Sequence, residues 1–247
     1  MNSKGRIILS PASAGSFNMS LDQALLESVE SDQQPVLRFY RWTPATLSLG
    51  YFQPAADRQL HPASGSCPIV RRASGGGAIV HDDELTYSIC IRTSGAVAKA
   101  NTDLYDTVHQ AIRKALKLQS IEVELFGEGP AAKKSDPFLC FQRRFKGDLI
   151  CGESKIGGSA QRRLKTALIQ HGSLLLSQSS FAPELPGLAE LAGREVDVDD
   201  LIQKVTVEIA AATGVEFSAG ETTDAELQRA AEVEKEKFGA EAWLQRR

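Results

Sequence analysis

The stretch RRASGGGAIVHDDELTYS, residues 71–88, places three consecutive glycines between a pair of arginines and a strand-like run. Glycine weakens the interior of a strand, and it often marks a place where a ligand or another backbone approaches closely. Arginine binds phosphates, carboxylates and carbonyls through charge-assisted hydrogen bonds. The stretch therefore indicates either a ligand-binding loop or a sheet bulge with surface arginines. It contains neither a Walker motif nor the GxGxxG spacing of a dinucleotide-binding loop.

A second pair of glycines lies in KIGGSAQ, residues 155–161. Period-two alternation would divide this strand into two faces, one with Lys155, Gly157, Ser159 and Gln161, and the other with Ile156, Gly158 and Ala160. A lysine beside a glycine on one face of a strand lies next to open space, where it can act as an acid or as an oxyanion partner. The alternative is a solvated lysine in a hairpin.

Hydrophobic periodicity predicts a mixed β-sheet flanked by helices, an α/β (α+β) fold in one domain that spans residues 1–247. The expected helices cover 18–30, 102–117, a segment from about 197 to Gly214, and 224–238. The expected strands cover 36–42, 46–52, 85–91, 121–126 and 166–176, with a hairpin of 148–151 and 155–163. Residues 127–147 read as a long surface loop that carries Cys140, and loops of that length are usually functional or disordered.

Composition restricts the class of protein. Hydrophobic residues make up 42% of the 247, charged residues make up 24%, and the formal net charge is −3. These values are ordinary for a globular protein and give no reason to expect nucleic acid or an anionic membrane as a partner. No signal peptide or membrane-length apolar run is apparent, so we expect a cytoplasmic protein. No two of the four cysteines form a CxxC pair, which favours free thiols over a structural zinc site.

Several motifs, taken together and in order, resemble one known superfamily. RRASGGGAIVHDDELTYS, KIGGSAQ and IQHGSLLL are similar to segments of the lipoate–protein ligase and octanoyltransferase superfamily, and FNMSLDQALL, LRFYRWTPATLSLGYFQ and EKFGAEAW extend the similarity over nearly the whole chain. The resemblance implies a mixed sheet packed by helices, related to the biotin protein ligase catalytic domain. It also implies attachment of an eight-carbon acyl group, octanoyl or lipoyl, to a lysine of a carrier protein.

Within this superfamily, the resemblance favours transfer through a cysteine thioester. Cys140, in SDPFLCFQ, matches the nucleophile position of octanoyltransferases from bacilli that act on the glycine-cleavage H protein, and Lys155 would polarise the acyl carbonyl. Cys140 could instead be a small core residue, and Cys151 is its main competitor. We expect Cys67 and Cys90 to be packed in strands.

Other features bear on the choice between ligase and transferase. HDDELTYS matches the transferase pattern, because ligases tend to carry a glycine-asparagine pair where this chain has Asp83-Glu84. The chain ends soon after EKFGAEAW, so we expect no accessory domain of the kind that many ligases need. The segment Ser74-Gly75-Gly76-Gly77, in contrast, is more similar to the corresponding motif of ligases than to that of transferases.

The resulting expectation is transfer of octanoyl from octanoyl-acyl carrier protein, through Cys140, to a lysine of a lipoyl-domain protein such as the glycine-cleavage H protein or an E2 subunit, without a metal or cofactor. The alternatives are a lipoate–protein ligase that uses ATP and Mg, an amidotransferase between carrier proteins, and a non-catalytic protein that binds acyl groups or carriers. The residues expected to bind substrate are Arg71, Arg72, Ser74, Gly75, Gly76, Gly77, His81, Gly157, Gly158, Ser159, Ala160, His171 and Gly172. His61 and His109 are expected on the surface or on a helix face.

Overall fold

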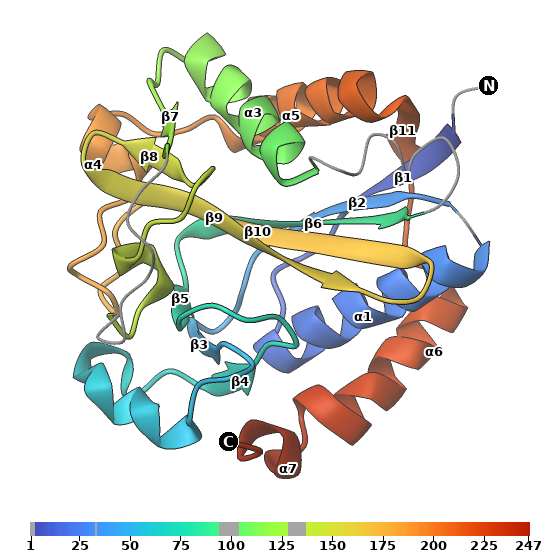
Figure 1. The fold of residues 1–247 in the computed structure, drawn as a ribbon, viewed down its shortest axis with the longest axis horizontal. Coiled ribbons are helices and arrows are strands. Elements are labelled where there is room, and N and C mark those ends of the chain that lie inside the picture. The colour runs from blue at the N-terminus through green and yellow to red at the C-terminus, as the bar shows by residue number, and fades with distance from the viewer. Residues whose placement is uncertain (1–2, 33, 94–103, 128–136) are drawn as a thin grey trace.

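The fold is a mixed sheet covered by helices on both faces (Figure 1). The computed structural model describes residues 3–32, 34–93, 104–127 and 137–247. Eight strands form the large sheet in the order β11-β1-β2-β6-β10-β9-β8-β7. The first three of these are parallel to one another, and every other neighbouring pair is antiparallel. The predicted mixed sheet with flanking helices is confirmed.

The strands of the large sheet are β1 (Ser3–Leu9), β2 (Val36–Tyr40), β6 (Glu84–Arg92), β7 (Glu124–Leu125), β8 (Leu149–Cys151), β9 (Ser154–Arg163), β10 (Ala167–Leu175) and β11 (Val215–Ala219). A second sheet consists of β3 (Thr46–Leu49), β4 (Ile69–Arg71) and β5 (Ile79–His81), in the order β4-β3-β5. The α-helices are α1 (Gly15–Asp32), α3 (Leu104–Leu118), α4 (Leu188–Ala192), α5 (Val198–Thr213), α6 (Asp224–Val233) and α7 (Glu241–Leu244). A π-helical segment, Glu234–Phe238, follows α6 without a break.

Helices α3 and α5 cover one face of the large sheet, and α1 and α6 cover the other (Figure 1). The buried side of α3 repeats every three or four residues, which is the spacing of one face of an amphipathic helix. Its members are Leu104, Val108, Ile112 and Ala115, and Leu201, Val205 and Ile209 play the same part in α5. On the opposite face, Leu21, Leu25 and Val29 of α1 pack against the sheet. The apolar periodicity thus accounts for both helical layers.

The strand predicted over 46–52 ends early, at Leu49, because two backbone segments meet there. A Cβ atom on Gly50 would lie only 2.0 Å from the carbonyl oxygen of Gly76. No side chain fits at such a contact, so the glycine at position 50 allows the chain to cross the glycine-rich segment. The strand predicted over 121–126 is also shorter, since only Glu124–Leu125 pair with β8.

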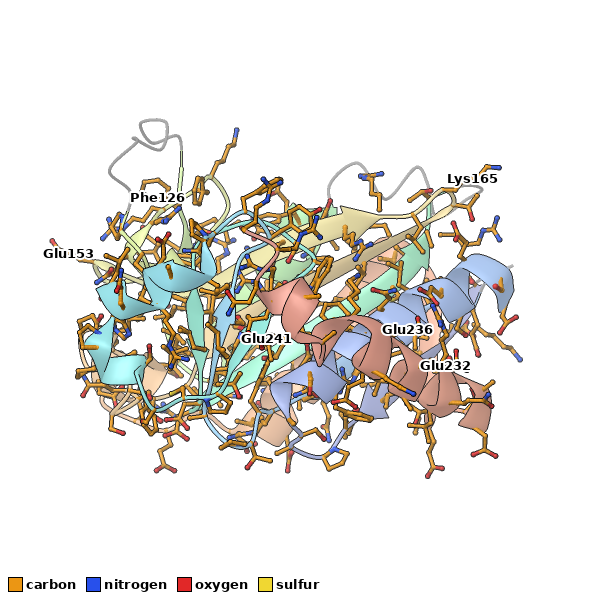
Figure 2. The ribbon with its side chains drawn as sticks, turned by 90° about the horizontal axis from the view of Figure 1, so that it is seen from below. Phe126, Glu153, Lys165, Glu232, Glu236 and Glu241 are labelled. Carbon is orange, nitrogen blue, oxygen red and sulfur yellow. The ribbon has the colours of Figure 1, made fainter. Side chains whose placement is uncertain are left out.

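Strand β9 runs the length of the molecule. Glu153 and Lys165, in the turns just before and just after it, lie at opposite ends of the view in Figure 2. One end of β9 pairs with the short strand β8, and the rest pairs with β10. Because β9 is so long, its middle crosses beneath the small sheet, where the functional residues collect.

Candidate active site

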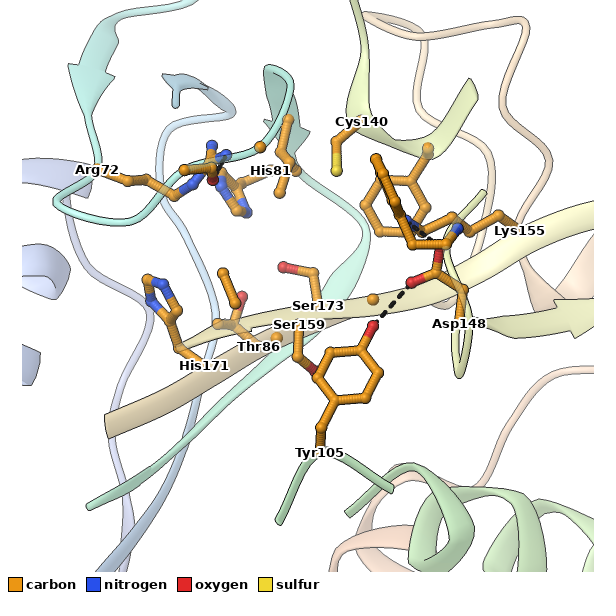
Figure 3. Close-up of a pocket in the computed structure, with 18 of the residues that line it drawn as sticks. Arg72, His81, Thr86, Tyr105, Cys140, Asp148, Lys155, Ser159, His171 and Ser173 are labelled. Carbon is orange, nitrogen blue, oxygen red and sulfur yellow. Dashed lines mark hydrogen bonds and ion pairs between the residues drawn. The ribbon is translucent and has the colours of Figure 1, made fainter. Parts of the chain in front are cut away.

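A cavity of about 370 Å³ lies between the α1 face of the large sheet and the small sheet (Figure 3). This volume falls in the range of about 300–1,000 Å³ that is usual for small-molecule sites. The lining residues come from the glycine-rich segment, the segments around Cys140 and Asp148, strands β2, β5, β6, β9 and β10, and helices α1 and α3. Of the residues expected to bind substrate, those that line the cavity are Arg72, Gly75, Gly76, His81, Gly158, Ser159, Ala160, His171 and Gly172.

Arg72 holds the glycine-rich segment in place. Its Nη1 donates to the carbonyl oxygen of Ser48 at 2.7 Å, and its Nη2 donates to the carbonyl oxygen of Gly77 at 2.7 Å. The guanidinium is almost completely buried, and burial lowers its pKa, whereas the charges of Cys140 and Glu84 raise it. Arg72 therefore borders the cavity while its donors are engaged by the protein itself.

Arg71 does not line the cavity, unlike Arg72, so its expected role in substrate binding stays a prediction that the structure does not support. Its side chain is fully buried, and its donors go to backbone carbonyls of Gly50, Gln53 and Leu244. A buried cation needs such partners because the cost of desolvating it is otherwise large. Arg71 thus ties the loop after β3 to the C-terminal helix α7.

The glycine-rich segment lets the backbone of Cys140 approach closely. A Cβ atom on Gly77 would lie 2.9 Å from the nitrogen of Cys140. The Cys140 amide donates to the carbonyl oxygen of Ala78 at 2.7 Å, and the Ala78 amide donates to that of Phe138 at 3.0 Å. The third glycine of the run therefore serves a backbone pairing, which positions the cysteine.

Cys140 is the cysteine that lines the cavity, and the structure describes all four. Cys140 begins a short 3₁₀ turn and is half-buried, and its sulfur points into the cavity in Figure 3. The other three are buried, and burial raises the pKa of each thiol. Cys67, Cys90 and Cys151 are therefore suited to packing. Cys151 does not line the cavity, so its position does not favour it over Cys140 as the nucleophile.

Lys155 forms a buried ion pair with Asp148, and both residues line the cavity. Its Nζ lies 2.7 Å from Asp148 Oδ2, and only 2% of each side chain is exposed. Tyr105 donates its hydroxyl to Asp148 Oδ1 at 2.9 Å, and the Phe145 amide donates to Oδ2 at 2.7 Å. Burial and the Asp148 charge raise the pKa of Tyr105, so it remains a donor. The Lys155 Nζ also lies 5.7 Å from the ring centre of Phe141, the residue after Cys140.

The predicted alternation of side chains between the two faces of β9 is wrong for the residues that follow a β-bulge. Leu149 pairs with Gly157 and Ile150 pairs with Lys155, so Ile156 is an extra residue in β9. The bulge moves Gly158 and Ala160 onto the face that carries Lys155. A Cβ atom on Gly158 would lie 2.8 Å from Lys155 Cε and 3.0 Å from Nζ. Gly158 is thus the glycine that leaves room for the lysine, whereas Gly157 faces Leu149 in the core.

Ser159 borders the cavity but turns its hydroxyl to the α3 side. It hydrogen-bonds the hydroxyl of Tyr87 and Nε2 of His109. His109 Nδ1 contacts the carbonyl oxygen of Gly147 at 2.6 Å. Since a carbonyl can only accept, Nδ1 donates there and Nε2 accepts from Ser159. His109 is therefore a buried connection between α3 and β9, and of the two expected positions it takes the helix face and not the surface.

His61 is also buried, away from the cavity, where it contacts Ser64 and Glu184. The pKa of His109 is lowered chiefly by burial, which agrees with a neutral ring that accepts from Ser159. Gly172 packs against this same network, because a Cβ atom there would lie 2.5 Å from Ser159 Oγ.

His171 and His81 form the floor of the cavity. His171 Nε2 lies 2.7 Å from the hydroxyl of Ser74, and burial lowers the pKa of the ring to about 4. His81 stacks on Trp42 at 3.8 Å between ring centres, and its Nδ1 lies 2.7 Å from Glu84 Oε1. Both imidazoles are thus held rigidly, which suits residues that shape a binding site.

Several residues of the cavity were not predicted from the sequence, among them Met19, Tyr40, Trp42, Thr86, Tyr105, Phe141, Phe145, Asp148 and Ser173. Ser173 had a usable signal, since it follows His171 by two residues in the same strand and shares its face. The sequence offers a weaker indication for Asp148, which is the acidic residue at the start of the predicted hairpin. Tyr105 had none, because the first turn of an amphipathic helix gives no reason to expect it in a site.

In the described ranges, no group of three or more histidine, cysteine, aspartate or glutamate side chains is arranged to hold a metal ion. Among the helices of the described part of the chain, none combines the length and apolar character that crossing a membrane requires.

Comparison with known proteins places the chain in a family. The model of the lipoyl protein ligase A/B catalytic domain matches residues 14–210. An octanoyltransferase LipM from Clostridioides difficile (strain 630) is 31% identical, over 98% of each chain. Another, from Exiguobacterium sibiricum, is 32% identical, over 92% of this chain and 93% of the relative.

Solved structures agree on the fold. Lipoate-protein ligase A bound with ATP superposes with a TM-score of 0.79 at 23% identity, over 98% of each chain. A bi-partite lipoate protein ligase from Thermoplasma acidophilum gives 0.74 at 20%, over 98% of this chain and 96% of that one. The resemblance predicted from the motifs is confirmed, and the chain belongs to the lipoyl protein ligase A/B catalytic domain family.

Proposed function

We propose that this protein is an octanoyltransferase that moves an octanoyl group onto a lysine of a lipoyl-carrier protein through a thioester on Cys140. The observation that carries the proposal is the position of Cys140, whose thiol faces a cavity that the buried Lys155–Asp148 ion pair also lines. A thiolate both attacks a thioester readily and leaves again when an amine attacks. The identity of the curated relatives, named octanoyltransferases, supports the same reaction.

The octanoyl tail would lie along β9 and β10. The wall there is formed by Gly158, Ala160 and Gly172, which carry little or no side chain. Trp42 and Met19 add apolar side chains to the lining. Each methylene buried from water contributes about 0.8 kcal/mol, so the cavity has enough apolar contact to hold an acyl chain and to select its length.

In the first half-reaction, the Cys140 sulfur attacks the carbonyl carbon of the donor thioester. A new carbon–sulfur bond forms to Cys140, the bond to the donor sulfur breaks, and the donor thiol leaves with the proton that Cys140 has lost. Negative charge develops on the carbonyl oxygen as the tetrahedral intermediate forms. The Lys155 ammonium, oriented by Asp148, would stabilise that charge.

In the second half-reaction, a lysine amine of the acceptor attacks the octanoyl-Cys140 carbonyl. The amide bond forms, the bond to Cys140 breaks, and the amine proton returns to the cysteine. The products are an octanoylated lysine and the free thiol. No redox change and no external energy source are needed, because a thioester is converted to a more stable amide.

The donor in this proposal is octanoyl-acyl carrier protein, and the acceptor is a lipoyl-domain protein such as the glycine-cleavage H protein or an E2 subunit. Two of the cations that line the cavity are engaged by protein acceptors, Arg72 by carbonyl oxygens and Lys155 by Asp148, and Lys146 lines the cavity as well. That arrangement supports a neutral thioester over a triphosphate as the substrate, and thus a reaction without ATP or another cofactor. We assign the reaction to the cytoplasm, where free thiols stay reduced.

Intact-protein mass spectrometry after mixing with octanoyl-acyl carrier protein tests the proposal. The expected result is one octanoyl adduct in the wild type and in Cys151→Ser, and none in Cys140→Ser. Modification of an apo carrier from free octanoate and ATP, unaffected by Cys140→Ser, would establish a ligase instead. An adduct formed only from octanoylated H protein would establish an amidotransferase, and no adduct from any donor would leave a binding protein.

A further inference from the structure

A second hollow adjoins the active-site cavity on its outer side. This outer groove has a volume of about 490 Å³. It is lined by Phe52, Gln53, Pro54, Asp57, Leu60, Gly76, Phe138, Arg143 and Phe145. Gly76 and Phe145 line the inner cavity as well, so the two hollows share a border. A ligand too long for the inner cavity can continue into the groove at that border.

The reactive sulfur lies at this border. A Cβ atom on Gly76 would lie 3.8 Å from Cys140 Sγ and 3.6 Å from Arg72 Nη2. The space that the glycine leaves open is therefore next to the sulfur. An acyl group attached to Cys140 would extend inward from this point, and a leaving group on the other side of the carbonyl would extend outward.

Exposed apolar side chains gather in the outer groove. Among the described residues, the large hydrophobic side chains that are exposed are Leu9, Phe52, Leu60, Leu118, Phe145, Val207 and Leu227. Three of these line the groove, with Phe52 exposed to 69%, Leu60 to 62% and Phe145 to 43%. A cluster of exposed apolar residues in a concave surface indicates a binding site.

Polar and basic groups accompany the apolar wall. Arg143 lines the groove, and the guanidinium carbon of Arg247 lies 5.7 Å from the ring centre of Phe52. The Gln53 side chain donates to the carbonyl oxygen of Phe138 at 3.3 Å and accepts from the Gly50 amide at 2.9 Å, and its second N–H and second lone pair can pair with an amide of a ligand. The groove therefore combines apolar contact, amide hydrogen bonding and positive charge, with Asp57 as its acidic lining residue.

We propose that the outer groove binds the phosphopantetheine arm of the acyl donor. The proposal rests on the proposed function, since it places the leaving thiol of the first half-reaction. The arm contains two amides and a dimethyl carbon, and it ends in a phosphate through which the carrier protein is attached. The apolar side chains match the dimethyl carbon, the amide of Gln53 matches the amides, and the arginines match the phosphate.

The experiment compares donors that differ only in the arm. Octanoyl-acyl carrier protein and octanoyl-coenzyme A carry the whole arm, whereas octanoyl-N-acetylcysteamine carries the thioester and one amide. The rate of octanoyl-Cys140 formation at subsaturating donor is measured by intact mass for Phe52→Ala, Leu60→Ala and Arg143→Ala. The matched controls are Leu118→Ala, an equally exposed leucine on α3, and Arg163→Ala at the distant end of β9.

The groove variants should slow acylation by both full-length donors about tenfold, because each removes a contact to the arm, and should change the short donor by less than about twofold. The controls should leave all three rates unchanged. An equal effect on all three donors, or an effect on the carrier protein but not on coenzyme A, would overturn the assignment. So would slowing confined to transfer from octanoyl-Cys140 to the acceptor. If the wild type forms no adduct with any donor, the proposed function itself has failed.

Discussion

The ammonium of Lys155 and the carboxylate of Asp148 form an ion pair of 2.7 Å that is almost completely removed from solvent. Asp148 also accepts from the Tyr105 hydroxyl, and these two interactions are drawn in Figure 3. Charges that are buried and paired in this way are fixed in direction, which is the requirement for stabilising a charge that appears only in the transition state. The pair therefore defines where the carbonyl oxygen of a substrate should lie.

Asp148→Asn should slow octanoyl-Cys140 formation by about 10²-fold, because the lysine loses the group that orients it. The short donor octanoyl-N-acetylcysteamine, followed by intact mass, isolates this step from arm binding. The variant leaves a buried cation without its partner, so the free energy of unfolding should also fall by about 3 kcal/mol. Tyr105→Phe keeps the ion pair and is the control, with a smaller effect on both quantities. Unchanged acylation in Asp148→Asn would show that the ion pair is structural only.

Gly158→Ala and Gly157→Ala should differ in what they damage. A methyl group at position 158 would contact Lys155, so acylation should fall about tenfold. A methyl group at position 157 would contact Leu149 in the core at 2.7 Å, so stability should fall by about 1–3 kcal/mol. Acylation rates and urea unfolding of both variants test the bulge in β9. If the rate loss belonged to Gly157→Ala instead, the simple alternation would be the correct register.

Ser159→Ala should destabilise the protein while leaving the acylation rate nearly unchanged. The hydroxyl lies between Tyr87 and His109, so its removal leaves buried groups without a partner, at a cost of about 1–3 kcal/mol. Urea denaturation and the single-turnover rate measure the two effects. A rate loss larger than the accompanying change in folded fraction would mean that the serine contacts substrate, as the sequence suggested.

His171 should make stability depend on pH. Its pKa is lowered from 6.5 to about 4 by burial, so the unfolded chain binds the proton more tightly than the folded protein does. Stability is therefore retained above pH 6.5 and is lost as the pH falls toward 4, by about 2 kcal/mol at pH 5. The free energy of unfolding, measured by denaturation at pH 7 and at pH 5, should fall by this amount more in the wild type than in His171→Gln. Parallel losses in the two proteins would place the titration elsewhere.

Much of the fold was predictable because helices and long strands carry strong periodic signals. The buried face of α3 and the positions of β6 and β10 follow directly from the sequence, although both strands are buried on both faces. Strands β1 and β11, which lie at one end of the large sheet, were not predicted, since few of their residues are buried and neither shows a clear alternation. The π-helical segment after α6 was likewise read as ordinary helix.

Prediction of the site failed where tertiary contacts decide orientation. An inserted residue such as Ile156 reverses the side of the residues that follow it, and no local pattern marks it. Arg71 and Arg72 are adjacent and chemically identical, but one faces the cavity and the other faces α7. His109 sits on the inward face of a helix, and its partners come from residues far along the chain. The expectation of a single domain over residues 1–247, and the catalytic roles of Cys140 and Lys155, stay predictions.

The pairing of Ala78 with Leu139 has a consequence for how this enzyme could diversify. Cys140, the proposed nucleophile, belongs to a short segment that is paired with the glycine run by main-chain hydrogen bonds, whereas Lys155 belongs to the large sheet. The cysteine and the lysine of the proposed reaction therefore lie in two segments of the sequence that can change independently. Replacing a few residues of that segment could exchange one mode of acyl activation for another, while the strands that would bind the acyl chain stay unchanged.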